Sequence, residues 1–150
     1  MTSAHESEGD ALAQRVCAHL HALDSSGPTR GMEPIECRMG LVRVRMLVTR
    51  EMLNSHAIAH GGIVFALADT SLAYAAMSRN RMAVTRQATM EFLSPARDGE
   101  TLIAEARELT LSERGGVYIV TVRSADGRVI ALVHGLTRTT GEPVLPPSEE

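Results

Sequence analysis

Aromatic residues are scarce in this chain, and neither sign of charge is in large excess. Its 150 residues include no tryptophan, two phenylalanines and two tyrosines, and the formal net charge at pH 7 is -3. Proteins that bind nucleic acid rely on a basic surface and, for single strands, on aromatic side chains that stack on bases. The composition therefore argues against a nucleic-acid partner and favours a small-molecule ligand.

We also expect no targeting segment and no membrane-spanning segment. The opening residues, MTSAHESEGD, are polar and acidic, whereas a secretory signal needs a basic start and an apolar run. The most apolar stretch, residues 63–77, is too short and too interrupted by Asp69, Thr70 and Ser71 to cross a bilayer, which needs about 20 apolar residues. We therefore expect a cytoplasmic protein that makes no membrane contact.

Metal-ligand spacings are absent as well. Cys17 and Cys37 are the two cysteines, and their spacing fits no metal motif. A cytosolic chain keeps such thiols reduced, so we predict that both are packing residues. His56 and His60 fall in a loop with no carboxylate or thiol near them in sequence to complete a metal site. We expect neither a metal nor another cofactor.

What the chain does contain is enough apolar sequence for one domain with a core. Hydrophobic residues make up 44% and charged residues 22% of the 150 positions. From Asp10 to about Leu23, apolar residues recur at helical spacing and predict an amphipathic helix. Residues 1–9 and the proline-rich, acidic segment 141–150 are predicted to be disordered tails of this single domain, 1–150.

The rest of the chain has the two-residue period of β-strands. The alternation between Glu33 and Met46 breaks near Gly40 and predicts a hairpin of two strands with one solvated face. Four further strands are predicted, at Met82–Leu93, Thr101–Leu111, Gly116–Ser124 and Arg128–Thr139. A buried helix with about five to six antiparallel strands is an α+β design.

The predicted buried helix carries one carboxylate. Residues 63–77, IVFALADTSLAYAAM, are apolar or small on nearly every side, so the helix should be buried, yet Asp69 lies in its middle. A buried carboxylate needs a partner, and no lysine or arginine stands three or four positions away. Two interpretations are open for Asp69: a base or nucleophile in an apolar cleft, or a structural residue held by hydroxyl or backbone donors.

The start of this helix favours the first interpretation. His60, Gly61 and Gly62 lie where the first turn leaves backbone N–H groups free and the helix dipole is positive. Glycine lets a ligand approach the backbone, and such N–H groups stabilise a developing oxyanion. The sequence HGG alone is also typical of an ordinary loop-to-helix turn, but a lone acid follows it here.

The spacing of these groups predicts a dimer. Gly61 and Asp69 are eight residues apart, which corresponds to about 12 Å along a helix. A single carbonyl group cannot contact both ends of that span. If both groups act on one bond, they must come from two antiparallel copies of the helix, so we expect a symmetric homodimer with two equivalent sites.

The segment MLNSHAIAHGGIVFALADTSLAYAAMSRN resembles the signature of the hotdog-fold acyl-CoA thioesterases, and within that family the hydroxyphenylacetyl-CoA thioesterases of phenylacetate degradation. The similarity continues through TMEFLSPARDGETL and GGVYIVTV, and it covers roughly residues 33–141. It implies a hotdog fold, in which an antiparallel sheet wraps a long central helix. It also implies a homodimer as the catalytic unit and a homotetramer as the assembly.

The resemblance also implies roles for single residues. Asp69 matches the catalytic carboxylate, which directs water onto the thioester carbon or attacks it to give a mixed anhydride. Gly61 matches the backbone N–H that polarises the thioester carbonyl, with His60 beside it. Asn54 matches the amide residue near the thioester, and Ser55 stands where close relatives often have glycine.

The predicted function is hydrolysis of an aryl or a short- to medium-chain acyl-CoA to free acid and CoA. We expect Gly62, Thr70 and Arg97 to contact this substrate, and Arg97 is one of several arginines that suit the CoA phosphates. One alternative is a hotdog dehydratase or hydratase acting on 3-hydroxyacyl or enoyl thioesters, with His56 and Asp69 as the reacting pair. Another is a non-catalytic acyl-CoA binding protein.

Overall fold

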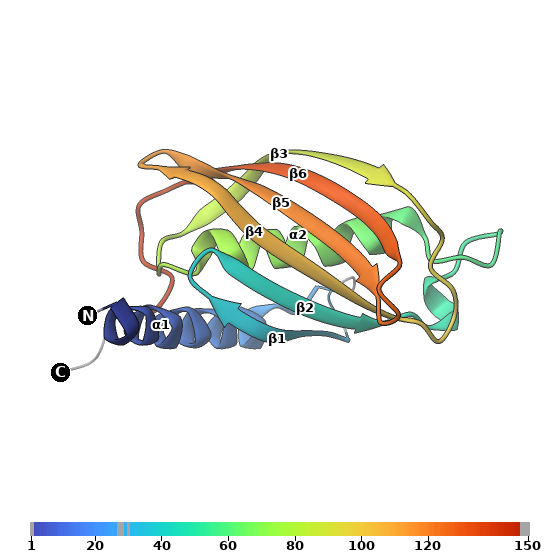
Figure 1. Ribbon diagram of the computed structural model, residues 1–150, viewed down its shortest axis with the longest axis horizontal. Coiled ribbons are helices and arrows are strands. Elements are labelled where there is room, and N and C mark those ends of the chain that lie inside the picture. Colours follow the sequence, from blue (N-terminus) through green and yellow to red (C-terminus); the bar gives the residue numbers. More distant parts are fainter. Residues whose placement is uncertain (1, 27–28, 30, 148–150) are drawn as a thin grey trace.

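The computed structural model describes residues 2–26, 29 and 31–147. A six-stranded antiparallel sheet curves around helix α2, and helix α1 lies beside strand β1 at one edge of that sheet (Figure 1). The elements in chain order are α1 (Thr2–Leu23), β1 (Met32–Arg38), β2 (Leu41–Leu47), the 3₁₀ turn η1 (Arg50–Met52), α2 (Gly61–Met77), β3 (Ala83–Phe92), β4 (Thr101–Ser112), β5 (Gly115–Ser124) and β6 (Val129–Thr139).

The strand order is β1-β2-β4-β5-β6-β3, and every neighbouring pair is antiparallel. This architecture confirms the predicted α+β class with six antiparallel strands, and its central helix, α2, has 17 residues. The predicted hairpin is β1–β2, and its turn includes Gly40 at φ +73. Strands β1 and β3 are the two edges of the sheet.

The core lies between α2 and the concave face of the sheet. Alternate residues of the central strands point inward and are fully buried, as Val44 of β2, Ala104 of β4 and Val120 of β5 illustrate. From the helix, Leu67 and Leu72 are fully buried against them. Strand β6 has Gly135 at the contact, where a Cβ atom would lie 2.1 Å from the Leu72 Cδ1 atom. Glycine at this position therefore lets the helix lie close to the sheet.

The N-terminal helix is longer than predicted, because α1 begins at Thr2 and not at Asp10. Residues 2–9, for which the sequence predicts a disordered tail, are part of this helix. The β1–β2 turn contacts α1 around residues 9 and 10: the Met39 N–H donates to Asp10 Oδ1 at 3.2 Å, and a Cβ atom on Gly9 would lie 2.2 Å from Met39 Cε. Apolar periodicity starts only after Asp10, so the sequence pattern did not indicate the earlier turns.

The C-terminal segment, which the sequence predicts to be a disordered tail, contacts Asn80 at Val144 and Leu145. The backbone N–H groups of these two residues donate to Asn80 Oδ1 at 3.0 and 2.7 Å. Their side chains pack on the small cluster of Val16, Met77 and Ala83. Residues 148–150 of the predicted tail lie outside the described residues.

Candidate active site

His60 caps the N-terminus of α2. Its Nδ1 atom accepts the Gly62 N–H at 2.9 Å, which requires Nδ1 to be unprotonated, and its carbonyl oxygen accepts the N–H groups of Ile63 and Val64. Among the described residues, no acceptor lies within hydrogen-bond distance of the Gly61 N–H. The cap therefore satisfies every N–H of the first turn except the one that the sequence assigns to an oxyanion.

A phenyl ring packs against Gly61 on the side where a side chain would stand. A Cβ atom built on Gly61 would lie 3.1 Å from Phe92 Cζ and 3.3 Å from Phe92 Cε1. Phe92 ends strand β3 and remains 59% exposed. The missing side chain at Gly61 thus leaves space between the helix start and an exposed aromatic ring.

The loop before α2 is closed by the Asn54 side chain. Asn54 Oδ1 accepts the backbone N–H groups of His56 at 2.9 Å and Ile58 at 3.4 Å, so its amide oxygen must face the loop. The Nδ2 amino group has no acceptor among the described residues, so it is the half of the amide that can donate to a ligand. Ala57 takes the left-handed conformation, at φ 57, whereas Ser55 does not, so serine fits at position 55 without strain.

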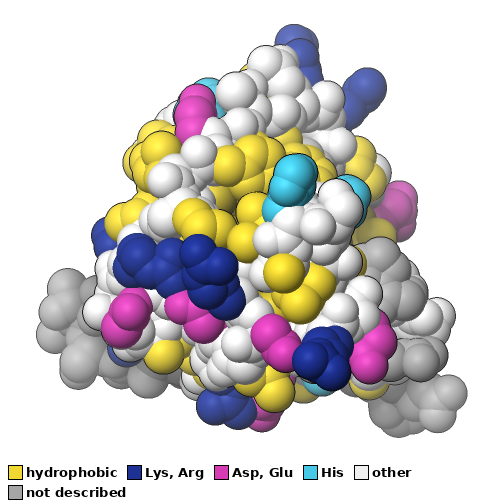
Figure 2. Space-filling view, turned by 90° about the vertical axis from the view of Figure 1, so that its right-hand side faces the viewer, with side chains coloured by type: hydrophobic (Ala, Val, Ile, Leu, Met, Phe, Trp, Pro, Cys, Tyr) yellow, Lys and Arg dark blue, Asp and Glu magenta, His cyan; other side chains and the backbone are white. Residues whose placement is uncertain are grey.

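Asn54 and Gly61 border one hollow of about 440 Å³. Most of its wall is apolar and includes Val64, Phe92, Leu93, Pro95, Ala96 and Ile130. Figure 2 shows hydrophobic side chains gathered beside histidine side chains at this end of the molecule, where the loop before α2 lies. An apolar hollow with a few converging donors suits an acyl group whose carbonyl oxygen needs hydrogen bonds.

Asp69 lies in the middle of α2 and is half-buried. Its Oδ1 atom accepts a hydrogen bond of 2.9 Å from the Thr85 hydroxyl group of β3. No arginine pairs with it among the residues that the structure describes. One hydroxyl donor leaves the Oδ2 atom free, so the carboxylate retains an oxygen that can act on a ligand or a water molecule.

Asp69 borders a second hollow, of about 400 Å³. Thr70, Ala73, Tyr74 and Met77 of α2 line it together with Leu20, Leu23 and Asp24, which lie at the C-terminal end of α1 or just after it. The Thr70 hydroxyl donates to the Ala66 carbonyl oxygen at 2.8 Å, inside its own helix. Asp69 and Thr70 therefore share a different hollow from Asn54 and Gly61, as their spacing along the helix requires.

The remaining predicted site residues lie around the first hollow. Gly62 is exposed at the helix start, and its N–H is used by His60. Arg97 is exposed in the loop after β3, next to Ala96 of the hollow wall, and it makes no ion pair within the described part of the chain. His56, the alternative partner of Asp69, is exposed on the 54–60 loop and does not border the Asp69 hollow.

Two contacts at the site were not predicted from the sequence. Thr85 holds the Asp69 carboxylate from a strand 16 residues further along the chain, and Phe92 covers Gly61 from the end of the same strand. Strand alternation predicted β3 itself, but it does not tell which of its side chains meet α2. No sequence signal within α2 would have identified either contact.

The sequence of this chain matches a known family over its central part. Residues 56–131 match the profile of the family described as the Thioesterase superfamily. The chain is also 33% identical, over 133 residues, to the protein named acyl-coenzyme A thioesterase PaaI of Escherichia coli, covering 87% of this chain and 95% of that protein. The chain therefore belongs to the thioesterase superfamily.

Solved structures agree with this assignment. The structure of the E. coli PaaI protein, from the phenylacetic acid degradation operon, superposes with a TM-score of 0.87 at 32% identity, over 89% of this chain and 97% of that chain. A Streptococcus mutans protein bound to acetyl CoA superposes with a TM-score of 0.72 at 27% identity, over 75% and 90% of the two chains. These likenesses confirm the hotdog architecture that the signature implied.

Proposed function

We propose that this protein hydrolyses acyl-CoA thioesters to a free acid and CoA, in active sites that two subunits build together. The main observation behind the proposal is that Gly61, whose N–H is free at a capped helix start, borders an apolar hollow together with Asn54. The name of the E. coli relative and the acetyl CoA in the S. mutans structure support a CoA thioester as the substrate.

In the proposed reaction, the thioester carbonyl oxygen accepts the Gly61 N–H. This donor stabilises the negative charge that develops on the oxygen, and such a donor is typically worth about 3 to 4 kcal/mol in the barrier. The Asn54 Nδ2 group, which the loop leaves free, is a second donor at the same hollow. Both groups act without a metal or a prosthetic group.

Asp69 of the partner subunit supplies the carboxylate. It either takes a proton from the attacking water or attacks the thioester carbon itself, and its free Oδ2 atom suits both steps. General-base catalysis contributes roughly a hundredfold to ten-thousandfold in rate. The Thr85 hydroxyl group holds the other oxygen and so fixes the direction in which the free oxygen points.

The open edge of β3 supports the dimer. An exposed edge strand presents unpaired backbone groups that pair readily with another strand. Large apolar side chains are exposed on β3 and directly after it: Val84 is 54%, Phe92 59% and Leu93 56% exposed. Pairing of two β3 strands would bury these side chains and bring the two α2 helices together. Two such dimers form the homotetramer that we propose from the family resemblance.

Details of the substrate follow from the hollow and its rim. Its apolar wall suits aryl and short- or medium-chain acyl groups, and the unpaired Arg97 beside it suits a CoA phosphate. The operon of the E. coli relative makes phenylacetate degradation the pathway we propose.

Among the described residues, every helix is too short or too polar to cross a membrane. We propose that the protein works in the cytoplasm.

The test is release of free thiol from a panel of aryl and straight-chain acyl-CoAs, with the wild type and Asp69→Asn side by side. Turnover by the wild type alone supports the proposal and gives the acyl preference. A change in enoyl absorbance without thiol release would instead identify a dehydratase or hydratase. Binding of CoA without any turnover would identify a binding protein.

A further inference from the structure

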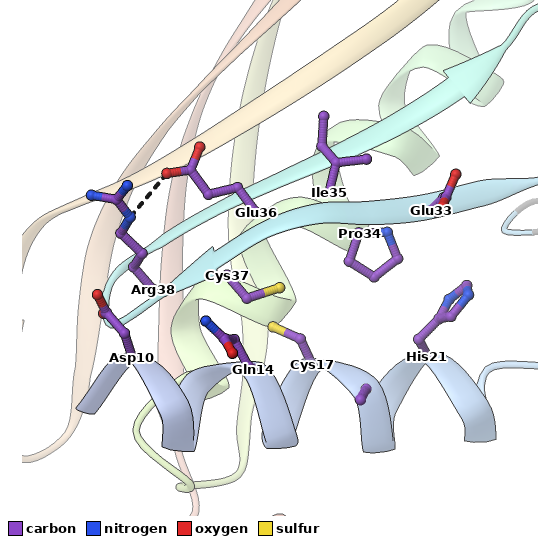
Figure 3. Close-up of a pocket in the computed structure, with 11 residues that line it drawn as sticks. Asp10, Gln14, Cys17, His21, Glu33, Pro34, Ile35, Glu36, Cys37 and Arg38 are labelled. Carbon is purple, nitrogen blue, oxygen red and sulfur yellow. Dashed lines mark ion pairs between the residues drawn. The ribbon is translucent and has the colours of Figure 1, made fainter. Parts of the chain in front are cut away.

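The two cysteines, far apart in sequence, meet between α1 and β1. Cys17 lies on α1 and is 1% exposed, and Cys37 lies on β1 and is half-buried. Figure 3 shows their sulfur atoms pointing toward each other across the contact between the two elements. Both residues pack on the core, as predicted, and both thiols are free. Neither takes part in the proposed hydrolysis.

A large hollow gives access to this pair. It has a volume of about 930 Å³, and both cysteines line it together with His21 of α1 and with Pro34 and Glu36 of β1. Cys37 is the more exposed of the two residues, whereas Cys17 is buried in the core cluster. A small oxidant in the hollow would therefore reach Cys37 first.

The two thiols differ chemically because they interact. A hydrogen bond from the Cys17 thiol lowers the pKa of Cys37, against the opposing effects of burial and of the nearby Glu36 carboxylate. The same hydrogen bond, together with burial, raises the pKa of Cys17. The thiolate is the reactive form of cysteine, so the lowered pKa and the greater exposure of Cys37 both favour it as the thiol that reacts first.

We propose that Cys17 and Cys37 form an oxidisable dithiol, in which a hydroperoxide oxidises Cys37 and Cys17 then closes a disulfide between α1 and β1. In the first step the Cys37 thiolate attacks the peroxide, the O–O bond breaks, and Cys37 becomes a sulfenic acid while an alcohol or water leaves after taking up a proton. In the second step the Cys17 sulfur attacks the Cys37 sulfur, and water leaves. The two thiols lose two electrons in total, and the O–O bond gains them.

This bond would fix the helix that borders the Asp69 hollow. Leu20 and Leu23 line that hollow, and they follow Cys17 on the same helix by three and six residues. The disulfide closes a loop of about 20 residues, and a cross-link of that length stabilises a fold by restricting the unfolded chain. Oxidation should therefore raise the melting temperature by about 5 °C or more. The inference concerns the cysteines alone and does not depend on the proposed hydrolysis.

Peptide mapping of the full chain tests the bond directly. Wild-type protein is treated with hydrogen peroxide, unfolded in N-ethylmaleimide and cleaved with trypsin, which separates Cys17 (residues 16–30) from Cys37 (residues 31–38). We expect the two peptides to be joined, with a mass that is two hydrogens below the sum of the masses of the two reduced peptides. A reductant should separate them. On a non-reducing gel the oxidised protein should run as a single chain.

Single-cysteine variants are the controls. Cys17→Ser should leave Cys37 as a sulfenic acid that dimedone traps, whereas Cys37→Ser should leave the buried Cys17 unmodified by peroxide. Two results would overturn the proposal: both wild-type peptides labelled by N-ethylmaleimide after peroxide, or joined peptides found only in a covalent dimer. A melting temperature that is unchanged in fully oxidised wild type would overturn the predicted stabilisation.

Discussion

At its C-terminal end α2 is tied to several other elements, whereas at its N-terminal end it meets a hollow with unused donors. After the last turn, Ser78 accepts the Gly40 N–H at 2.9 Å and Asn80 holds the C-terminal segment. Arg79 forms an ion pair with Glu108, which also accepts a 3.2 Å hydrogen bond from the Tyr118 hydroxyl group. The polar groups at this end are used for the fold.

The N-terminal end of α2 has two hydrogen-bond donors that the fold does not use. The Gly61 N–H and the Asn54 Nδ2 group have no partner among the described residues, and Phe92 and Leu93 expose apolar surface next to them. Unpaired donors cost stability when they are buried, so they are retained where a ligand can use them. The comparison indicates that one end of the helix fixes the fold and that the other end binds the reacting group.

The largest effect is expected from Asp69→Asn. Asparagine keeps the size of the side chain and can still accept the Thr85 hydroxyl group, but it can neither take a proton from water nor attack a thioester. We expect kcat to fall by about a hundredfold to ten-thousandfold, with an unchanged melting curve. The matched control is Asp126→Asn in the β5–β6 turn, which should leave kcat unchanged. Loss of folding in Asp69→Asn would favour the structural interpretation of Asp69.

The next largest effect is expected from Gly61→Pro, which removes the N–H. Proline suits the first position of a helix, and His60 at φ -57 and ψ 134 already has the conformation required before proline. We expect a loss of about a hundredfold to a thousandfold in kcat, since an oxyanion donor is lost. Gly61→Ala is the matched control, because it retains the N–H and places a Cβ atom against the same Phe92 ring. Equal activity of both variants would exclude the N–H from catalysis.

At the opposite end, Glu108→Gln should affect stability alone. It removes the ion pair with Arg79, whose side chain is 34% exposed, so the cost is reduced by solvent to about 1 to 2 kcal/mol in the free energy of unfolding. Denaturant unfolding measures it, and kcat per folded molecule should stay at the wild-type value. A fall in kcat at equal folding would contradict the division between the two ends.

The smallest effects are expected from a pair of variants at Asn54. Asn54→Asp keeps the oxygen that closes the loop and removes the amino donor, so we expect kcat to fall about tenfold with little change in stability. Asn54→Ala removes both, and should also lower the free energy of unfolding by about 1 kcal/mol because two backbone N–H groups lose their acceptor. Full activity of Asn54→Asp would exclude the Asn54 amino group from catalysis.

Local patterns in the sequence predicted the central helix and the six strands, but not the first turns of α1. The strand expected at Thr101–Leu111 is β4, one residue longer, because its buried and solvated sides alternate along most of its length. Between the strands predicted at Gly116–Ser124 and Arg128–Thr139, Gly127 has φ +91, a conformation that glycine adopts without strain. A period of two residues is a property of the segment itself, so it can be read without knowing the neighbouring strands.

Contacts between distant segments could not be predicted in the same way. Thr85 on Asp69, Phe92 on Gly61 and Cys17 beside Cys37 each join two elements, and periodicity tells which side of an element is buried but not what covers it. For the candidate site, the spacing of Gly61 and Asp69 did predict that one chain keeps them apart. The structure places them in separate hollows.

The most direct test of the shared active site is activity of a mixed dimer. Asp69→Asn and Gly61→Pro chains are each expected to be nearly inactive, and they are co-expressed and purified together through different tags. A mixed dimer then has one site with both groups intact, so thiol release should return to about half of the wild-type value per dimer. Activity no higher than that of the two separate variants would contradict the account, because it would mean that Gly61 and Asp69 act within one chain.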